Sequence, residues 1–311
     1  MEAYVLGLDG GGTKTLAQAM DAQGAPLFCV RGGALNANSE AYRRVRDTVQ
    51  ELLAQAAVCA GPDRYLAAVC IAAAGAGNPD ACRVLRSALA DAGFRGPARV
   101  VGDHLAALTG ALGSPEGMVL IAGTGSICAG RTADGREARA GGRGHLIDDE
   151  GSGYAMGRDV LRAVVEAEDG RGPCTCLTPA VYKALQVTDV AGLVSYVYAP
   201  GRSKREIACL ARLLPQAAAR DDRAAQRIYM RAAEELARLV QAVAERLAMQ
   251  NGSLALAGGA LYNDAHLREL LEARLNRLLP ELHVVQARHD AAWGAAQMAR
   301  GLLSSNREEL R

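Results

Sequence analysis

The sequence has almost no excess of charge of either sign. Its 311 residues carry 35 lysine and arginine side chains against 34 aspartates and glutamates, a formal net charge of +1. A domain that binds nucleic acid or an anionic membrane surface usually has a basic patch and a basic excess. We therefore expect neither partner, and predict that the protein acts on a small molecule.

Long apolar runs are also missing, although half of all residues are hydrophobic. No run approaches the ~20 apolar residues that span a bilayer. The first residues have the pattern of a core strand, whereas a secretion signal would place a charged segment before a cleavable apolar one. Secretion and membrane insertion are therefore not expected.

Cysteines are present but not clustered. Eight of them are scattered along the chain, several inside apolar strand or helix patterns. This distribution is typical of reduced thiols and predicts a cytoplasmic protein. Cys174 and Cys176 lie close in sequence, but no nearby His or Cys completes four zinc ligands, so we favour an ordinary loop there.

The most informative stretch is a strand, a glycine turn and a second strand at residues 4–18. The first strand ends at Asp9 and is followed directly by three glycines. Backbone N–H groups without a Cβ beside them can approach phosphate oxygens closely. Thr13 separates Gly12 from Lys14, which excludes a Walker A loop, and the extended residues that follow exclude a Rossmann fingerprint. A phosphate-binding hairpin remains, with a hairpin that binds no ligand as the alternative.

The same plan recurs in the second half of the chain. A strand at 118–122 leads into the turn Gly123-Thr124-Gly125-Ser126, and residues 127–131 are again extended. Two such hairpins, one per domain, can hold one polyphosphate from both sides. At 311 residues, about two domains are expected. We predict mixed α/β domains at 1–115 and 116–311, the second with a helical insertion at about 170–220.

Polar residues follow several predicted strands. Asp103 stands between a strand at 98–101 and a helix at 105–112, where a carboxylate can take a proton from a substrate, although an N-cap is an equal alternative. Asn36 lies between a strand and a helix as well. Asp149 precedes a helix and could hold a substrate hydroxyl or metal-bound water, or only complement the helix dipole. The turn Gly258-Gly259 permits a flat ring such as adenine to lie against the backbone.

Five motifs in order, LDGGGTKT, GDH, IAGTGS, GGRGHLIDDEGSG and LAGGAL, resemble the BadF/BadG/BcrA/BcrD family. Within it they are similar to the N-acetylglucosamine kinase branch of the actin-like, hexokinase-like superfamily. The resemblance implies two ribonuclease H-like domains, each a mixed sheet flanked by helices, with ATP and Mg²⁺ in the cleft between them. It also implies phosphorylation of the 6-hydroxyl of N-acetylglucosamine or a close relative, such as glucosamine or N-acetylmuramic acid. Similar kinases are commonly homodimers.

The resemblance also implies roles for individual residues. Asp103 would be the base that takes the proton of the sugar hydroxyl, and Asp9 would position magnesium through water. The sugar would be contacted by Asn36, Gly125, Gly142 and Asp149. The phosphates would be held by Gly11, Gly12, Thr13, Gly123 and Thr124. Adenosine would face Gly258 and Gly259.

Two residues depart from the family pattern. Arg143 stands where the family often has an aromatic residue, and Asp148 stands where it often has glycine. An arginine in the sugar pocket would favour an anionic substituent, such as the lactyl group of N-acetylmuramic acid. Arg143 is therefore a candidate substrate-binding residue.

The other branch of the family is the alternative function. Its members are ATP-dependent activators of CoA-ester dehydratases or reductases that hold an iron–sulfur cluster between subunits. They carry a cluster-ligating cysteine just before the second glycine turn. This chain has Leu120 and Ile121 in that stretch, and Cys128 lies beyond the turn, so the kinase reading is favoured.

Overall fold

The computed structural model divides the chain into two compact units. Residues 1–117 and 286–311 form the first, and residues 118–285 form the second. The structure describes residues 1–12, 14–37 and 40–308, so the phosphate-binding role predicted for Thr13 lies outside the described residues. Within these ranges, no helix combines the length and apolar character needed to cross a bilayer.

The first unit is built on a five-stranded mixed sheet with the order β3-β2-β1-β4-β5. β1 pairs antiparallel with β2 and parallel with β4; β2–β3 is antiparallel, and β4–β5 is parallel. The strands are β1 (Glu2–Gly10), β2 (Thr15–Asp21), β3 (Pro26–Gly32), β4 (Arg64–Ala73) and β5 (Ala98–Gly102). The glycine turn thus joins two antiparallel strands, as the sequence predicts.

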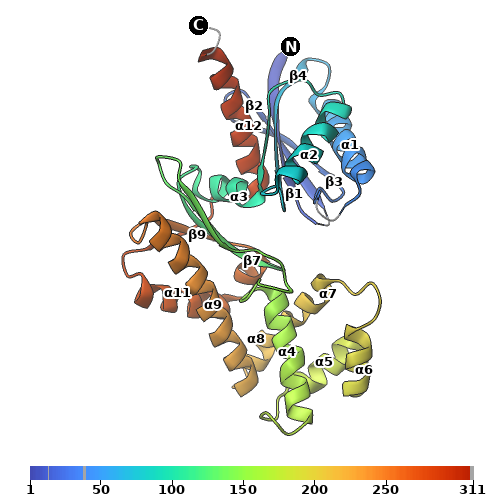
Figure 1. Cartoon of the computed structure of the whole chain (residues 1–311), viewed down its shortest axis with the longest axis vertical. Helices are drawn as coiled ribbons and strands as arrows, with labels where there is room; N and C mark the ends of the chain where they lie inside the picture. Colours follow the sequence, from blue (N-terminus) through green and yellow to red (C-terminus); the bar gives the residue numbers. More distant parts are fainter. Residues whose placement is uncertain (13, 38–39, 309–311) are drawn as a thin grey trace. The chain divides into compact units, whose positions relative to one another are not determined.

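Alternating residues of β1 build two cores, one on each face of this sheet. Tyr4, Leu6 and Leu8 pack with α1 (Tyr42–Ala60) and α2 (Pro79–Asp91). Val5 packs on the other face with α3 (Asp103–Leu112) and α12 (Ala291–Glu308). Figure 1 shows α12 across the sheet from α1 and α2. Successive side chains of a strand point to opposite faces, which explains the division.

The predicted domain boundary is wrong for residues 286–311. The sequence pattern assigns them to the second domain because they follow its last strand, but α12 packs on β1, β2, β4 and α3 of the first unit. Small residues allow this packing: a Cβ built on Gly7 of β1 would lie 1.9 Å from the Ala296 nitrogen. The buried face of α12 is made of alanines, namely Ala292, Ala295, Ala296 and Ala299.

Helices α3 and α12 cross so closely that glycine is required at their contact. A Cβ on Gly294 of α12 would lie 2.0 Å from the Ala106 carbonyl oxygen of α3. We expect Gly294→Ala to destabilise the protein by about 3 kcal/mol, because the backbone must move to make room. Gly301→Ala in the same helix, where a Cβ would meet nothing within 4 Å, should stabilise by up to about 1 kcal/mol. Urea denaturation of both variants checks this, and equal stabilities would contradict the close packing.

The second unit repeats the strand order of the first. Its sheet runs β10-β9-β6-β7-β8, so that each unit, numbered from its own first strand, has the order 3-2-1-4-5. The strands are β6 (Gly117–Ala122), β7 (Ser126–Arg131), β8 (Glu137–Gly141), β9 (Ser253–Ala257) and β10 (His283–Gln286). The predicted duplication of the glycine hairpin therefore extends to the whole sheet.

One large core holds the helices of the second unit against its sheet. Residues of β6 such as Met118 and Leu120 pack with α4 (Gly153–Glu168), α9 (Arg223–Leu247) and α11 (Ala265–Leu278), which lie on one side of the sheet (Figure 1). The short α10 (Gly259–Asn263) follows β9.

The predicted insertion consists of short helices joined by loops. It contains α5 (Leu177–Leu185), α6 (Val190–Val197), α7 (Lys204–Ala208), a 3₁₀ turn (Cys209–Leu213) and α8 (Leu214–Ala218). Asp222 connects the start of the insertion to α9. Its carboxylate caps that helix and also accepts a hydrogen bond from the Cys176 nitrogen at 2.8 Å. Cys176 thus has a structural place in the loop before α5.

Candidate active site

The first glycine turn presents an open face. The Gly11 nitrogen donates to the Lys14 carbonyl at 3.0 Å, and the Gly11 carbonyl accepts from the Leu35 nitrogen at 3.1 Å. Leu35 immediately precedes Asn36, so this bond brings Asn36 beside the turn. A Cβ built on Gly12 would meet nothing within 4 Å. The turn therefore leaves room for a ligand next to its backbone.

Three carboxylates interact beside this turn in the first unit. Asp9 shares a face of β1 with Val5 and Gly7, and that face is covered by α3 and α12. Asp103 begins α3, and Asp290 immediately precedes α12. Burial, together with the charges of Asp103 and Asp290, raises the pKa of Asp9 to about 6, and the charge of Lys14 acts in the opposite direction. The end of β1 is therefore a strongly negative and partly dehydrated place.

Asp103 is not the N-cap of its helix. Gly102 occupies the cap position, and Asp103 is the first helical residue, with its Oδ1 accepting from the His104 nitrogen at 2.9 Å. The side chain is 44% exposed. The cap interpretation is thus wrong in detail, and an accessible carboxylate stands at the carboxyl end of β5, where a reacting hydroxyl can approach.

The second glycine turn is joined to the start of α4. The Gly123 carbonyl accepts from the Gly153 nitrogen at 2.8 Å, and the Thr124 carbonyl accepts from the Tyr154 nitrogen at 3.3 Å. Gly258 packs against the strand that leads into this turn: its φ is +95°, and a Cβ there would lie 2.3 Å from the Ala122 carbonyl. The residues predicted to contact phosphate and adenosine therefore adjoin one another within the second unit, with Gly259 opening α10.

Asp149 is the most constrained polar residue of the second unit. It is only 3% exposed and has a φ of +64°, a left-handed conformation that is uncommon for a residue with a Cβ. Its Oδ1 accepts from the Ser126 nitrogen at 3.4 Å, and a Cβ on Gly125 would lie 2.9 Å from its Oδ2. Ser152, not Asp149, caps α4. Strain and burial of this kind concentrate at functional sites.

Charged groups around Asp149 act on its ionisation. Burial raises the pKa of Asp149 and outweighs the Ser126 N–H and the Lys204 charge, which both lower it. Asp148 raises the pKa and His145 lowers it. The pKa of Asp149 is therefore above its ordinary value.

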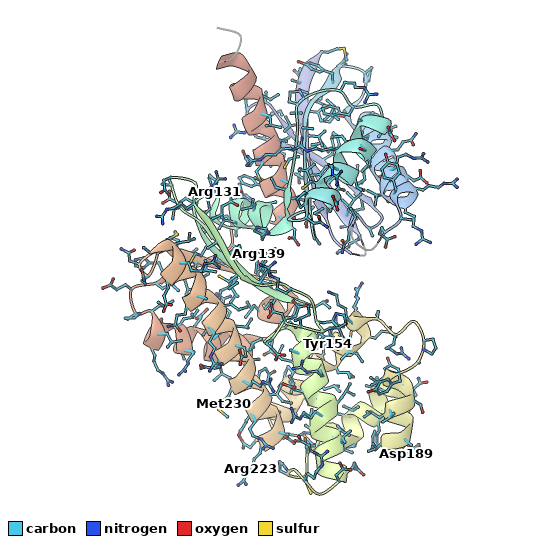
Figure 2. All side chains as sticks on the ribbon, in the orientation of Figure 1. Arg131, Arg139, Tyr154, Asp189, Arg223 and Met230 are labelled. Carbon is cyan, nitrogen blue, oxygen red and sulfur yellow. The ribbon has the colours of Figure 1, made fainter. Side chains whose placement is uncertain are left out.

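The loop at 141–148 precedes Asp149 and holds two further predicted sugar-site residues, Gly142 and Arg143. Gly142 has a φ of +68° and packs on Ile127, and the Arg143 nitrogen donates to Asp148 Oδ2 at 3.3 Å. His145 meets the edge of Tyr154 with the ring centroids 4.8 Å apart; Figure 2 shows Tyr154 at the start of α4. The structure thus gathers four predicted sugar-site residues in the second unit: Gly125, Gly142, Arg143 and Asp149. Asn36 and Asp103 belong to the first.

The family model of the BadF/BadG/BcrA/BcrD ATPases matches residues 6–299. The chain belongs to this family. An N-acetylmuramic acid/N-acetylglucosamine kinase of Clostridium acetobutylicum is 36% identical over 300 residues, covering 96% of this chain and 98% of the relative. An N-acetyl-D-glucosamine kinase of Dictyostelium discoideum is 29% identical over 317 residues, covering 94% and 97%.

Solved structures share the fold of this chain. A Chromobacterium violaceum protein, provisionally named an N-acetylglucosamine kinase, superposes with a TM-score of 0.76 at 27% identity, covering 95% of this chain and 98% of its own. A ROK family glucokinase from Streptomyces griseus, in complex with glucose and AMPPNP, has a TM-score of 0.57 at 20% identity, covering 96% and 99%. The predicted fold, two mixed α/β domains of the actin-like ATPase type, is confirmed.

The cysteines of this family member are all free thiols. Leu120 and Ile121 lie within β6, and Cys128 is fully buried in the core, where burial raises the pKa of its thiol. Across the described ranges, no group of three His, Cys, Asp or Glu side chains lies together as a set of metal ligands. An ion beside Asp9 would take its remaining ligands from water and phosphate, the usual arrangement for Mg²⁺ at nucleotides.

Two charged residues of the site escaped the sequence analysis. Asp290 lies between β10 and α12, and an aspartate between a strand and a helix was the signal that singled out Asp103. Its Oδ1 accepts from the Trp293 nitrogen at 2.9 Å, which is the geometry of an N-cap. Lys204 carried no local signal, because only the packing of α7 brings it to Asp149.

Proposed function

We propose that this member of the BadF/BadG/BcrA/BcrD family is an ATP-dependent kinase of amino sugars. Its substrates would be N-acetylglucosamine and close relatives, N-acetylmuramic acid among them, and the accepting group would be the 6-hydroxyl. The observation that carries the proposal is the accessible carboxylate of Asp103 in the unit that holds the open glycine turn and Asp9. Near end-to-end similarity to the Clostridium kinase supports the choice of substrate.

The two glycine turns would bind the phosphates of ATP through backbone N–H groups. The N–H groups of Gly12 in the first unit and Thr124 in the second would donate to phosphate oxygens. Gly11 and Gly123 would border the phosphates, because their own N–H groups close the turns by donating to the Lys14 and Gly125 carbonyls. Gly258 and Gly259 would contact adenosine. Phosphoryl transfer needs in-line positioning and charge stabilisation more than covalent help from the protein. Fixed backbone donors supply both without reorganising during the reaction.

Asp103 would act as the general base. Its free carboxylate oxygen takes the proton of the sugar 6-hydroxyl as that oxygen forms a bond to the γ-phosphorus and ADP leaves. The sugar would be oriented by Asn36, Gly125, Gly142 and Asp149. Asp149 suits this task because its backbone is fixed and its carboxylate borders the Gly125 turn.

The surroundings of Asp9 fit a divalent cation held through water. Its carboxylate is partly dehydrated and repelled by Asp103 and Asp290, so a nearby positive charge would stabilise its ionised form. Mg²⁺, when bound, would neutralise charge on the β- and γ-phosphates. Asp9, and not Asp103, would position it.

The proposal is tested by coupled ADP release with a panel of sugars. We expect turnover with N-acetylglucosamine and N-acetylmuramic acid, weaker turnover with glucose, and none without sugar. ADP release that is independent of every amino sugar, or a brown protein with visible absorbance after anaerobic purification, would favour the activator class instead.

Sedimentation velocity would test the predicted homodimer.

A further inference from the structure

Lys204 lies close enough to Asp149 for its charge to lower the pKa of that carboxylate. Lys204, one of three lysines in the chain, is exposed, and among the described residues neither Lys204 nor Arg143 forms an ion pair. Some other cations of the second unit form ion pairs, such as Arg158 with Glu150 and Arg274 with Glu234. The cations at the sugar site are therefore available to a ligand.

Lys204 is fixed in place by the packing of α7 on α4. A Cβ on Gly157 would lie 2.0 Å from the Ile207 carbonyl, and one on Gly153 would lie 3.6 Å from the Ala208 Cβ. Figure 1 shows α7 beside the first turns of α4. At 1.5 Å per residue, Lys204 stands about 6 Å along α7 from Ala208. From there its flexible four-carbon side chain brings the ammonium near enough to Asp149 to lower the pKa of that carboxylate.

The start of α7 is itself fixed. Ser203 and Glu206 form a capping box, in which the Ser203 nitrogen donates to Glu206 Oε2 at 2.8 Å. Lys204 is the first residue of the helix, so its backbone position does not depend on a mobile loop.

The acidic groups of this region are already engaged by backbone donors. Asp148 accepts from the Arg143 nitrogen and Asp149 accepts from the Ser126 nitrogen. The ammonium of Lys204, which also acts on the carboxylate of Asp149, and the guanidinium of Arg143 both belong to exposed residues. A ligand that fits this arrangement carries an anionic group at the edge of an otherwise neutral sugar.

We propose that Lys204 determines specificity by binding the carboxylate of the lactyl group of N-acetylmuramic acid. This inference rests on the proposed function and goes beyond it, because it assigns recognition of the acidic substituent to the helical insertion. N-acetylglucosamine lacks that substituent and does not use Lys204. The lysine is a binding residue and takes no part in phosphoryl transfer.

The test compares Lys204→Met with the wild-type enzyme on three sugars: N-acetylglucosamine, N-acetylmuramic acid and the methyl ester of N-acetylmuramic acid. The ester keeps the bulk of the substituent and removes its charge. Arg205→Met is the matched control, since Arg205 is the next residue on α7 and is also exposed. Thermal denaturation establishes that both variants are folded.

A charge-assisted contact is worth a factor of about ten or more in kcat/KM. We expect Lys204→Met to lose about that factor on N-acetylmuramic acid and to stay within about twofold of wild type on N-acetylglucosamine. Wild type should prefer the acid to its ester, and Lys204→Met should not. Lys204→Arg should retain the preference, and Arg205→Met should behave as wild type.

Three results would overturn the assignment. An equal loss on all three sugars would indicate a structural role for Lys204. A raised KM for ATP without discrimination between sugars would place the lysine at a phosphate. Equal wild-type rates on the acid and its ester would show that the charge is not recognised. Absence of turnover on N-acetylglucosamine in wild type would instead refute the proposed function, and this inference with it.

Discussion

Asp103→Asn is expected to lower kcat by roughly 100- to 10,000-fold, the usual contribution of a general base. Asparagine keeps the size of the side chain and the oxygen that accepts from the His104 nitrogen, so α3 should begin as before. What is lost is the ability to take the proton of the sugar hydroxyl. The affinity for ATP should be unchanged, since Asp103 has no assigned nucleotide contact.

Steady-state kinetics and calorimetric titration with a non-hydrolysable ATP analogue together test this expectation. Asp80→Asn is a suitable control, because Asp80 also lies in the first turn of a helix of the first unit. That variant should keep wild-type turnover. A loss of only a few fold in Asp103→Asn, or a parallel loss of nucleotide binding, would remove Asp103 from the role of base.

Asp9→Asn is expected to abolish turnover and yet to stabilise the ligand-free protein. In the folded state the pKa of Asp9 is raised to about 6, so between pH 4 and 6 the folded protein keeps a proton that the unfolded chain has lost. Stability therefore falls as the pH rises through this window. The difference of about two between the folded and unfolded pKa values of Asp9 corresponds to about 3 kcal/mol in the free energy of unfolding. This is the largest increase in stability that Asp9→Asn can give above pH 7.

Urea denaturation of both proteins at pH 4 and pH 8, without nucleotide or Mg²⁺, measures the effect. The free energies of unfolding should differ little at pH 4, where Asp9 is largely protonated in the folded protein, and most at pH 8. A variant that is less stable than wild type at pH 8 would contradict the view that Asp9 is held at an energetic cost for binding.

The order of elements and both glycine turns could be predicted from the sequence because each rests on local patterns. Apolar strands that lead into glycine turns predict β1 and β6. The repeated arrangement extends further than the motifs suggest, since both sheets have the same strand order. Asp149 could be proposed from its motif, but its left-handed backbone and its burial became visible only in the structure.

The features that could not be predicted all depend on packing between distant segments. Helix α12 returns to the first unit because Gly7 and Gly294 let its backbone approach β1 and α3. The same packing of α12 brings Asp290 beside Asp9. Lys204 reaches Asp149 only because Gly157 admits the backbone of α7. A lone glycine or lysine in a helical pattern carries no signal of such a partner.

The central claim is that the chain transfers the γ-phosphate of ATP to the 6-hydroxyl of an amino sugar. Carbon NMR of N-acetylglucosamine labelled with ¹³C at position 6, incubated with the enzyme and ATP, tests it most directly. We predict that the C6 signal shifts and splits by coupling to phosphorus while one ADP forms per sugar. An unsplit and unshifted C6 signal in the presence of sugar-dependent ADP release would contradict the account.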